Sequence, residues 1–313
     1  MSPAQTRERE SRWALPTALA TFAAVVLMIV GTFVVHISGS GAAAALRSVE
    51  EHSSSVDLSG LLRGVAYALL AVPLVYLFRA VEARSERVRR QLIYLVVVAP
   101  LFLAVSTGIG GFAQTEAASE FVGGKGKSTL SPAEAKEKCE SDRKSEGAKE
   151  FAQEFEPGQG ETAQEACENR KREDDRAENA LGEASLAPIV TGLGIAGALG
   201  FAAALFYSCL WAMRTGLLSR FWGALGMALG IAALLGLVIF TLIWFVYFGV
   251  LVLGRLPGGR SPAWEAGEAV PWPTPGEKAA AELEPGPDAE GGAVAEEPGP
   301  PDGPEPRKRK RRE

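Results

Sequence analysis

Long apolar runs alternate with charged segments along this chain of 313 residues. Four of the runs are long enough for a helix, rising 1.5 Å per residue, to cross about 30 Å of hydrocarbon. They cover residues 13–37, 58–80, 92–112 and 188–213. This pattern predicts an all-α fold, a polytopic transmembrane helix bundle in a multi-pass membrane protein.

The first run can be interpreted in two ways. Basic residues, an apolar stretch and then small residues resemble a secretory signal with a cleavage site. The stretch is longer than a signal core of about 7–15 residues, and it begins at Trp13, a residue type suited to a membrane interface. We therefore favour an uncleaved span that follows a cytoplasmic N-terminus, residues 1–12.

A fifth apolar stretch, residues 221–254, contains 34 residues without a charge. As one helix it would be about 51 Å long, which exceeds an upright span, but two spans would have only about 17 residues each. Gly236 is a weak break, and no polar turn divides the stretch. We favour a tight hairpin and six passages; five spans with one long tilted helix is the alternative.

A short basic loop, residues 79–91, separates the second and third runs. Short loops rich in Lys or Arg stay on the cytoplasmic side during insertion. The N-terminus is therefore predicted to be cytoplasmic and residues 113–186 to lie outside, and with six passages the C-terminus is cytoplasmic as well. The arginines that set this topology are Arg79, Arg84, Arg87, Arg89 and Arg90.

The insertion between the third and fourth runs, residues 113–186, holds 18 acidic and 11 basic residues. Ser131 and Glu134 have the spacing of a capping box at a helix start, and Thr162 and Glu165 repeat it. Large apolar residues are scarce, so we expect a helical, partly disordered insertion without a core of its own. Its predicted place outside makes it the expected contact for a protein partner.

Two cysteines of the insertion, Cys139 and Cys167, are candidates for a disulfide, since an oxidising compartment lets such bonds persist. If the first insertion helix ends at Gly147, the two side chains can meet across a helical hairpin. If it continues to Phe155, the register is wrong. We expect the disulfide, and we expect Cys209, alone in an apolar run, to be a small buried hydrophobe.

The last segment, residues 255–313, is rich in proline, glycine and glutamate. It cannot bury enough apolar surface to offset its ordering entropy, so we expect disorder. Near its start, Trp264 and Trp272 are expected to rest in the membrane interface. The basic residues at the end of the chain are candidates for contact with anionic lipid or a partner, the alternative is a terminus that only increases solubility, and we do not expect nucleic acid. These residues are Arg307, Lys308, Arg309, Lys310, Arg311 and Arg312.

Two glycine-rich motifs have the letters of nucleotide-binding patterns without their context. Residues 192–197, GLGIAG, lie in an apolar run with no preceding strand and no acidic residue about 20 positions on. Residues 123–129 lack the first glycine of a phosphate loop, because Phe121 occupies that position, and we interpret them as a flexible linker. We assign no catalytic, cofactor-binding or metal-binding residue and no cofactor.

Small residues four positions apart predict close helix packing. The pairs are Gly226 with Gly230 and Ala196 with Gly200. No run carries an Asp, Glu or Lys at its centre, which argues against a proton-coupled carrier and an intramembrane hydrolase. Arg63 lies one turn inside the second run, where a long side chain can snorkel to the headgroups.

Residues 216–227 (GLLSRFWGALGM) and 254–273 (GRLPGGRSPAWEAGEAVPWP) resemble a family of uncharacterised multi-pass integral membrane proteins of actinobacteria. The resemblance covers mainly the last third of the membrane part. It implies two short apolar segments between the motifs, a cytoplasmic start of the tail and a bacterial plasma membrane as the location of the protein. This chain departs from the family in having almost no linker between those segments. The family has no assigned activity, so the resemblance implies a topology and no chemistry.

These observations favour a non-enzymatic envelope protein that acts through protein or lipid contacts. The alternative is a small-molecule channel or carrier that lacks ionisable coupling residues within the membrane. Polar faces of several spans converging on one cavity would favour the alternative, whereas a bundle sealed by glycine and alanine packing would favour contacts.

Overall fold

The computed structural model describes residues 2–35, 41–146, 151, 155, 161–256 and 259–272. The chain divides into two units, residues 1–272 and 273–313. The second unit lies outside the described residues, and with it the predicted disorder beyond Trp272 and the basic cluster at residues 307–312. The predicted end of the first span, Ile37, also lies outside them.

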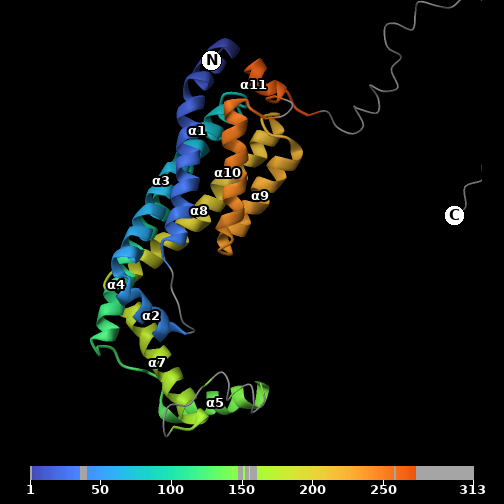
Figure 1. Ribbon diagram of the computed structural model, residues 1–313. Helices are drawn as coiled ribbons and strands as arrows, with labels where there is room; N and C mark the ends of the chain where they lie inside the picture. Colours follow the sequence, from blue (N-terminus) through green and yellow to red (C-terminus); the bar gives the residue numbers. More distant parts are fainter. Residues whose placement is uncertain are drawn as a thin grey trace, which may run out of the picture. The chain divides into compact units, whose positions relative to one another are not determined.

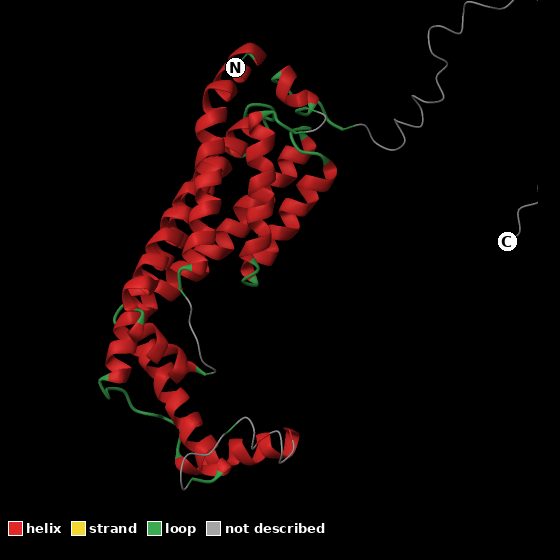
Figure 2. Cartoon of the chain, viewed as in Figure 1, coloured by secondary structure: helices red, strands yellow, loops and turns green. Residues whose placement is uncertain are grey.

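Within these ranges the secondary structure is helical and contains no strand (Figures 1 and 2). Four helical segments are long and apolar enough to cross a membrane, namely α1, α3, η1 with α4, and α8. The prediction of an all-α fold is confirmed for the described residues, together with the four apolar helices that a polytopic membrane protein needs. The helices are α1 (Pro3–Phe33), α2 (Ala42–Glu51), α3 (Ser53–Glu82), η1 (Arg90–Leu92), α4 (Ile93–Val122), α5 (Pro132–Glu146), α7 (Ala163–Glu183), α8 (Ala187–Arg214), α9 (Arg220–Leu234), α10 (Val238–Leu253) and α11 (Pro262–Ala266).

The fifth apolar stretch folds as two helices, α9 and α10, rather than as one long helix. Gly236 lies between them with a φ of +78°, a left-handed conformation that glycine adopts without steric cost. The Thr241 hydroxyl in α10 donates a hydrogen bond to the Leu229 carbonyl in α9 at 3.2 Å. The rings of Trp222 and Tyr247 stack between the helices with their centroids 3.5 Å apart. The stretch is therefore a helical hairpin, as predicted.

Helix α4 continues to Val122, past the predicted end of the third span. Glycines of both helices let α3 and α4 approach closely, and those of α4 do not end the helix. A Cβ atom on Gly111 would lie 3.0 Å from the Val56 carbonyl oxygen, and one on Gly64 would lie 2.7 Å from the Ala104 carbonyl oxygen. Close packing against α3 thus outweighs the low helix propensity of this segment.

Helix α1 also extends beyond its apolar run and includes most of residues 1–12. The Ser2 hydroxyl accepts a hydrogen bond from the Gln5 backbone N–H, and the Gln5 side chain accepts one from the Ser2 backbone N–H. This capping box satisfies two backbone donors that would otherwise lack partners at the helix start. Because of this local capping, α1 begins at Pro3, whereas the apolar run begins only at Trp13.

The main core draws on α1, α3, α4, α8 and α10, which together with α9 and α11 we call the bundle. Aromatic rings pack inside it. Trp244 stacks on Phe248 with centroids 5.4 Å apart, and Phe201 lies 6.3 Å from Phe245. The largest fully buried side chains of the bundle include Trp244, Phe78, Phe245, Phe248, Leu70, Leu74 and Leu77.

Three of the four small residues predicted to pack helices lie at close helix contacts. Gly226 and Gly230 in α9 lie against α8, and Gly200 in α8 lies against α4. Ala196 is exposed, and Gly197 takes its place, since a Cβ atom there would lie 2.8 Å from a backbone nitrogen of α4. The buried stripe of α8 follows helical spacing from Gly197 through Gly200, and Ala196 lies one residue off it.

A second, smaller core lies in the head, by which we mean α2, α4 from Ala113 onward, α5 and α7. Helix α2 was not predicted. We expected residues 113–186 to have no core of their own, and this core is a shared one: α2, which lies outside the insertion, and the end of α4 supply apolar side chains that α5 and α7 do not have. The buried members include Ala43, Leu46, Val49, Ala117, Ala118, Phe121, Ala177 and Ala180.

Candidate functional site

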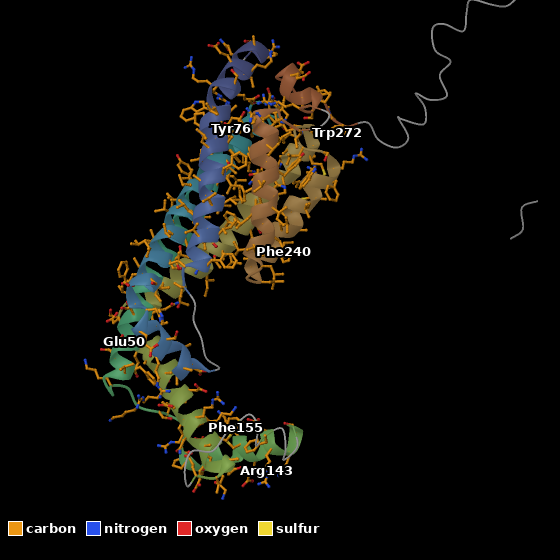
Figure 3. The ribbon with its side chains drawn as sticks, viewed as in Figure 1. Glu50, Tyr76, Arg143, Phe155, Phe240 and Trp272 are labelled. Carbon is orange, nitrogen blue, oxygen red and sulfur yellow. A yellow bond between two sulfur atoms is a disulfide. The ribbon has the colours of Figure 1, made fainter. Side chains whose placement is uncertain are left out.

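Segments far apart in sequence meet at one end of the bundle, which we call the basic end. They are residues 2–12, 79–92, 214–220 and 259–272. The Arg9 guanidinium donates to the Arg79 carbonyl, and that of Arg220 donates to the Trp272 carbonyl, each at 3.4 Å. Figure 3 shows Tyr76 and Trp272 at this end and Phe155 in the head.

Arg84, one of the five predicted topology-setting arginines, is the buried centre of the basic end. Its guanidinium bonds both carboxylate oxygens of Glu10 and donates to the Ala263 carbonyl at 2.9 and 3.1 Å. The two side chains are 0% and 6% exposed. The guanidinium also lies 5.4 Å from the ring centroid of Trp264. This ion pair is fully hydrogen-bonded, and it joins α1, the loop after α3 and α11.

The other four arginines of the loop keep surface positions. Arg79 and Arg90 each lie 3.1 Å from the carboxylate of Glu82. Arg87 and Arg89 are exposed. The loop thus combines one buried, structural arginine with four at the protein surface.

Trp264 and Trp272 close the bundle at the basic end. Trp264 is 4% exposed, and its indole N–H donates to the Leu217 carbonyl at 2.9 Å. The indole N–H of Trp272 donates to the Leu218 carbonyl at 2.8 Å. Both carbonyls lie in the turn after α8, where backbone acceptors lack helical partners. The expectation that Trp264 rests in the membrane interface is therefore wrong, and residues 259–272 are folded against the bundle.

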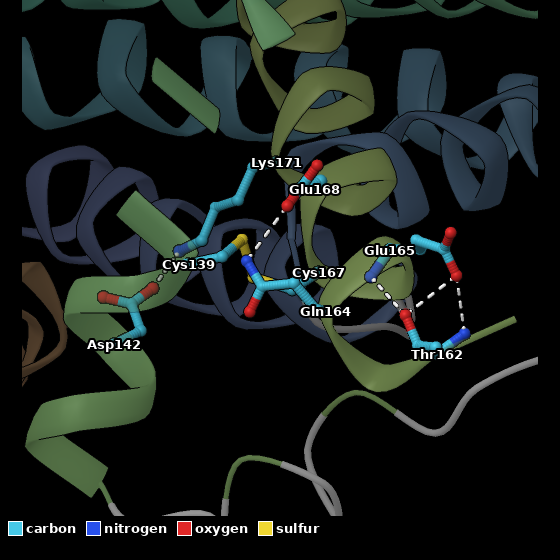
Figure 4. The surroundings of a disulfide bond; sticks show 8 residues. All are labelled: Cys139, Asp142, Thr162, Gln164, Glu165, Cys167, Glu168 and Lys171. Carbon is cyan, nitrogen blue, oxygen red and sulfur yellow. Dashed lines mark hydrogen bonds and ion pairs between the residues drawn. A yellow bond between two sulfur atoms is a disulfide. The ribbon is translucent and has the colours of Figure 1, made fainter. Parts of the chain in front are cut away.

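In the head, a disulfide joins Cys139 of α5 to Cys167 of α7, with the Cα atoms 6.1 Å apart (Figure 4). Helix α5 ends at Glu146, which matches the register on which this pairing was predicted. Both sulfur side chains are fully buried, and Phe151 and Phe155 pack beside them. The disulfide is thus the centre of a small core of its own.

The glycine-rich loop after α4 is held by α7, although we interpreted it as a flexible linker. The Asp175 carboxylate accepts a hydrogen bond from the Ser128 hydroxyl at 2.7 Å and from the backbone N–H groups of Thr129 and Leu130 at 2.7 and 3.0 Å. These bonds, that of Ser128 first, lower the pKa of Asp175 from its ordinary value. The donors that resemble a phosphate loop are therefore occupied by a carboxylate of the same chain.

Both predicted capping boxes are present in the head. The Glu134 carboxylate accepts from the Ser131 hydroxyl and backbone N–H at 2.7 and 2.9 Å. The Glu165 carboxylate accepts from the corresponding groups of Thr162, each at 2.8 Å (Figure 4). These bonds lower the pKa of both glutamates.

A polar cavity of about 360 Å³ lies between α1, α3, α4 and α8, on the side of the bundle nearer the head. Arg63 is the only charged residue in its lining, and its Nε atom finds no hydrogen-bond partner within the described residues. A buried, unpaired guanidinium nitrogen is costly in a membrane protein. The polar lining residues are Thr32, Ser59, Arg63, Ser106, Thr107 and Gln114.

The hydroxyl groups of this cavity present lone pairs rather than protons. The Ser59 hydroxyl donates to the Gly31 carbonyl at 2.6 Å, and that of Ser106 donates to the Val190 carbonyl at 2.8 Å. Arg63 is therefore the main donor, and the serine oxygens are acceptors. The lining suits a small polar molecule that carries both an anionic group and a donor group.

We did not predict this cavity from the sequence. Its one signal was Arg63 inside an apolar run, which we attributed to snorkelling. Across the described ranges, no three His, Cys, Asp or Glu side chains gather as a metal site would require. The GLGIAG motif, residues 192–197, lies within α8, directly after another helix.

No family model, curated protein or solved structure matches this chain. The resemblance of residues 216–227 and 254–273 to an actinobacterial membrane family therefore stays a prediction.

Proposed function

We propose that this chain is a non-enzymatic membrane protein that holds its helical head outside the cell, where the head binds a protein partner. One observation carries the proposal: the head is a continuation of the bundle and not a tethered loop. Helix α4 passes from the bundle into the head without a break. Helix α7 ends at Glu183 and α8 begins at Ala187, so the return path is also nearly continuous.

Hydrogen bonds and a cation–π contact strengthen this connection between the bundle and the head. The Ala187 backbone N–H donates to the Ala184 carbonyl at 2.9 Å, and the Ser185 hydroxyl donates to the Glu116 carboxylate at 2.8 Å. In the head, the Arg176 guanidinium lies 4.4 Å from the ring centroid of Phe121. A rigid support of this kind reduces the entropy that a binding surface loses on association.

We infer a topology of six passages with both described chain ends at the cytoplasmic face. Residues 2–12 and 259–272 lie together at the basic end, which supports an even number of passages. The apolar hairpin of α9 and α10 turns back at Gly236. The arginines gathered at the basic end agree with the cytoplasmic preference of basic loops.

The topology is tested with paired reporter fusions, one active only in the cytoplasm and one only outside. Fusions after Glu313 are expected to report the cytoplasm, and fusions inserted at Lys127 are expected to report the outside. Equal sidedness of the two positions would overturn the placement of the head.

The partner is tested by photo-crosslinking in intact cells, with the crosslinker at exposed head positions such as Lys138 in α5. We expect discrete protein adducts there. Leu19 in α1, 61% exposed on the bundle, is the matched control and is expected to give lipid adducts only. The absence of protein adducts at every head position, or the same adducts at Leu19, would contradict the proposal.

A second candidate function rests on the Arg63 cavity. Polar side chains of α1, α3 and α4 converge there, which favours binding of a small polar anion from the head side. The packed core between this cavity and the basic end favours a receptor or a gated carrier over an open pore. Binding of a small carboxylate by the wild type, lost in Arg63→Gln, would favour this candidate.

A further inference from the structure

An apolar groove of about 430 Å³ lies between α1 and α3 at the basic end. The two helices lie side by side there (Figure 1), and α4 contributes one side chain, Val97, to the groove. Its volume is within the range of pockets that hold small molecules, about 300–1,000 Å³. The apolar lining includes Trp13, Ala71, Val72, Val75, Tyr76 and Val97.

A polar pocket of about 650 Å³ continues from this groove. The two share Arg9 and Arg79, so these arginines stand where the apolar lining gives way to the polar lining. The polar pocket also includes Glu82 and Arg90. An apolar channel that opens on guanidinium groups matches a molecule with a hydrocarbon chain and an anionic head.

Two aromatic residues place this junction at the membrane interface. Trp13 lines the groove and is 54% exposed, and Tyr94 lines the polar pocket and is 72% exposed. Exposed Trp and Tyr side chains are typical of the headgroup level of a bilayer. The groove therefore faces the hydrocarbon, and the pocket faces the headgroups of the same leaflet.

The lining of the polar pocket has three arginines against two glutamates, Glu82 and Glu86, which leaves an excess of positive charge. The Glu10 carboxylate is neutralised by Arg84 inside the protein. Arg79 and Arg90 share the single carboxylate of Glu82, each at 3.1 Å. Two guanidinium groups on one carboxylate retain donors for a further anion, because each guanidinium has five N–H bonds.

We propose that this composite site binds one anionic glycerophospholipid, with an acyl chain in the groove and the phosphate between Arg9 and Arg79. A free phosphate would leave the apolar groove unfilled, and a neutral lipid would supply no anion to the excess positive charge of the polar pocket. The site lies at the opposite end of the bundle from the head, and it does not depend on the proposed partner.

The test measures lipid retention by native mass spectrometry of the full chain, incubated with phosphatidylglycerol or with phosphatidylcholine of the same acyl chains. The wild type is expected to retain one phosphatidylglycerol in preference to phosphatidylcholine. The double variant Arg9→Gln/Arg79→Gln is expected to lower this preference roughly thirtyfold, since each of the two interfacial arginines favours anionic lipid by about 1 kcal/mol and about 1.4 kcal/mol corresponds to a factor of ten. Arg12→Gln is the matched control, because Arg12 is 77% exposed and pairs with Glu8.

A variant in the groove tests the binding of the acyl chain separately from the binding of the headgroup. Val72→Trp fills the groove and leaves every arginine in place, so we expect it to lower phosphatidylglycerol retention as well. It also carries the test if the arginine variant does not fold. Unchanged retention in both variants would overturn the proposal. Equal retention of the two lipids by the wild type, or displacement of the lipid by millimolar glycerol phosphate alone, would do the same.

Discussion

The bundle and the head are two compact regions of one chain, held together by different forces. The bundle core contains large buried side chains such as Trp244, Phe245 and Phe248. The head core consists mostly of alanine and small aliphatic residues around Phe121, with a second small cluster at the disulfide. The bundle therefore has enough apolar volume to be stabilised by packing, and the head does not.

The head compensates with covalent and polar constraints. Its disulfide closes a loop of 28 residues in sequence separation, and such a closure restricts the unfolded chain. Carboxylates fix both helix starts and the loop after α4. The bundle has its main polar constraint at the basic end, where Arg84 joins three segments. Stability of the bundle should therefore depend on packing and one buried ion pair, and stability of the head on redox state and pH.

The sequence offers separate probes for the two regions. All six tryptophans lie in the bundle, from Trp13 to Trp272, and the head has none. Tryptophan fluorescence therefore reports on the bundle, and hydrogen exchange of α5 and α7 reports on the head. The predictions below use this division.

The largest effect is expected from Arg84→Ala. The substitution leaves the Glu10 carboxylate and the Ala263 carbonyl buried without their donor. Breaking one partner of a buried pair costs about 3–5 kcal/mol. We expect the free energy of unfolding, followed by tryptophan fluorescence in detergent, to fall by this amount.

Arg87→Ala is the control for this variant, because Arg87 lies in the same loop and is exposed. Surface substitutions change stability by about 0.5 kcal/mol or less. If the two variants had equal effects, Arg84 would contribute only surface charge. Head protection in hydrogen exchange should be nearly unchanged in both variants.

The second effect is expected from the double variant Cys139→Ser/Cys167→Ser. Loss of a disulfide across a loop of this size costs about 3 kcal/mol. We expect faster hydrogen exchange in α5 and α7 and an unchanged tryptophan transition. Reduction of the wild-type disulfide should reproduce the result, and Cys209→Ala removes the remaining thiol as a complication. A shift of the tryptophan transition would mean that the two regions unfold together.

The smallest effect on stability is expected from lowering the pH. The pKa of Asp175 is lowered in the folded head by the Ser128 hydroxyl and nearby backbone N–H groups. A carboxyl with a lowered folded pKa stabilises the fold above its ordinary pKa, about 4, and loses this contribution as the pH falls through the folded value. Glu134 and Glu165 act in the same direction.

We therefore expect protection of the head to decrease below about pH 4 while bundle fluorescence stays constant. Asp175→Asn should remove part of this pH dependence and weaken the loop after α4 at neutral pH. Head protection that is flat from neutral pH to below the ordinary carboxyl pKa would show that these bonds contribute nothing.

Local features of the sequence determined most of the helices. The apolar runs predicted the long helices, the boxes at Ser131 and Thr162 predicted the starts of α5 and α7, and Gly236 marked the hairpin turn. These signals act within a few residues, through hydrophobic periodicity, capping and backbone freedom. The register of Cys139 and Cys167 stayed open between a helix end at Gly147 and one at Phe155, and the observed end of α5 at Glu146 decides it.

Only the tertiary structure decided where the polar side chains of the bundle act. Arg84 is buried because residues 10 and 263, far away in sequence, bring a carboxylate and a carbonyl to it. Trp264 is buried because the turn after α8 presents a carbonyl to it. The Arg63 cavity and the lipid groove each need side chains of several helices. Such sites depend on helix packing across long sequence separations, and a hydrophobic pattern contains no information about which helices become neighbours.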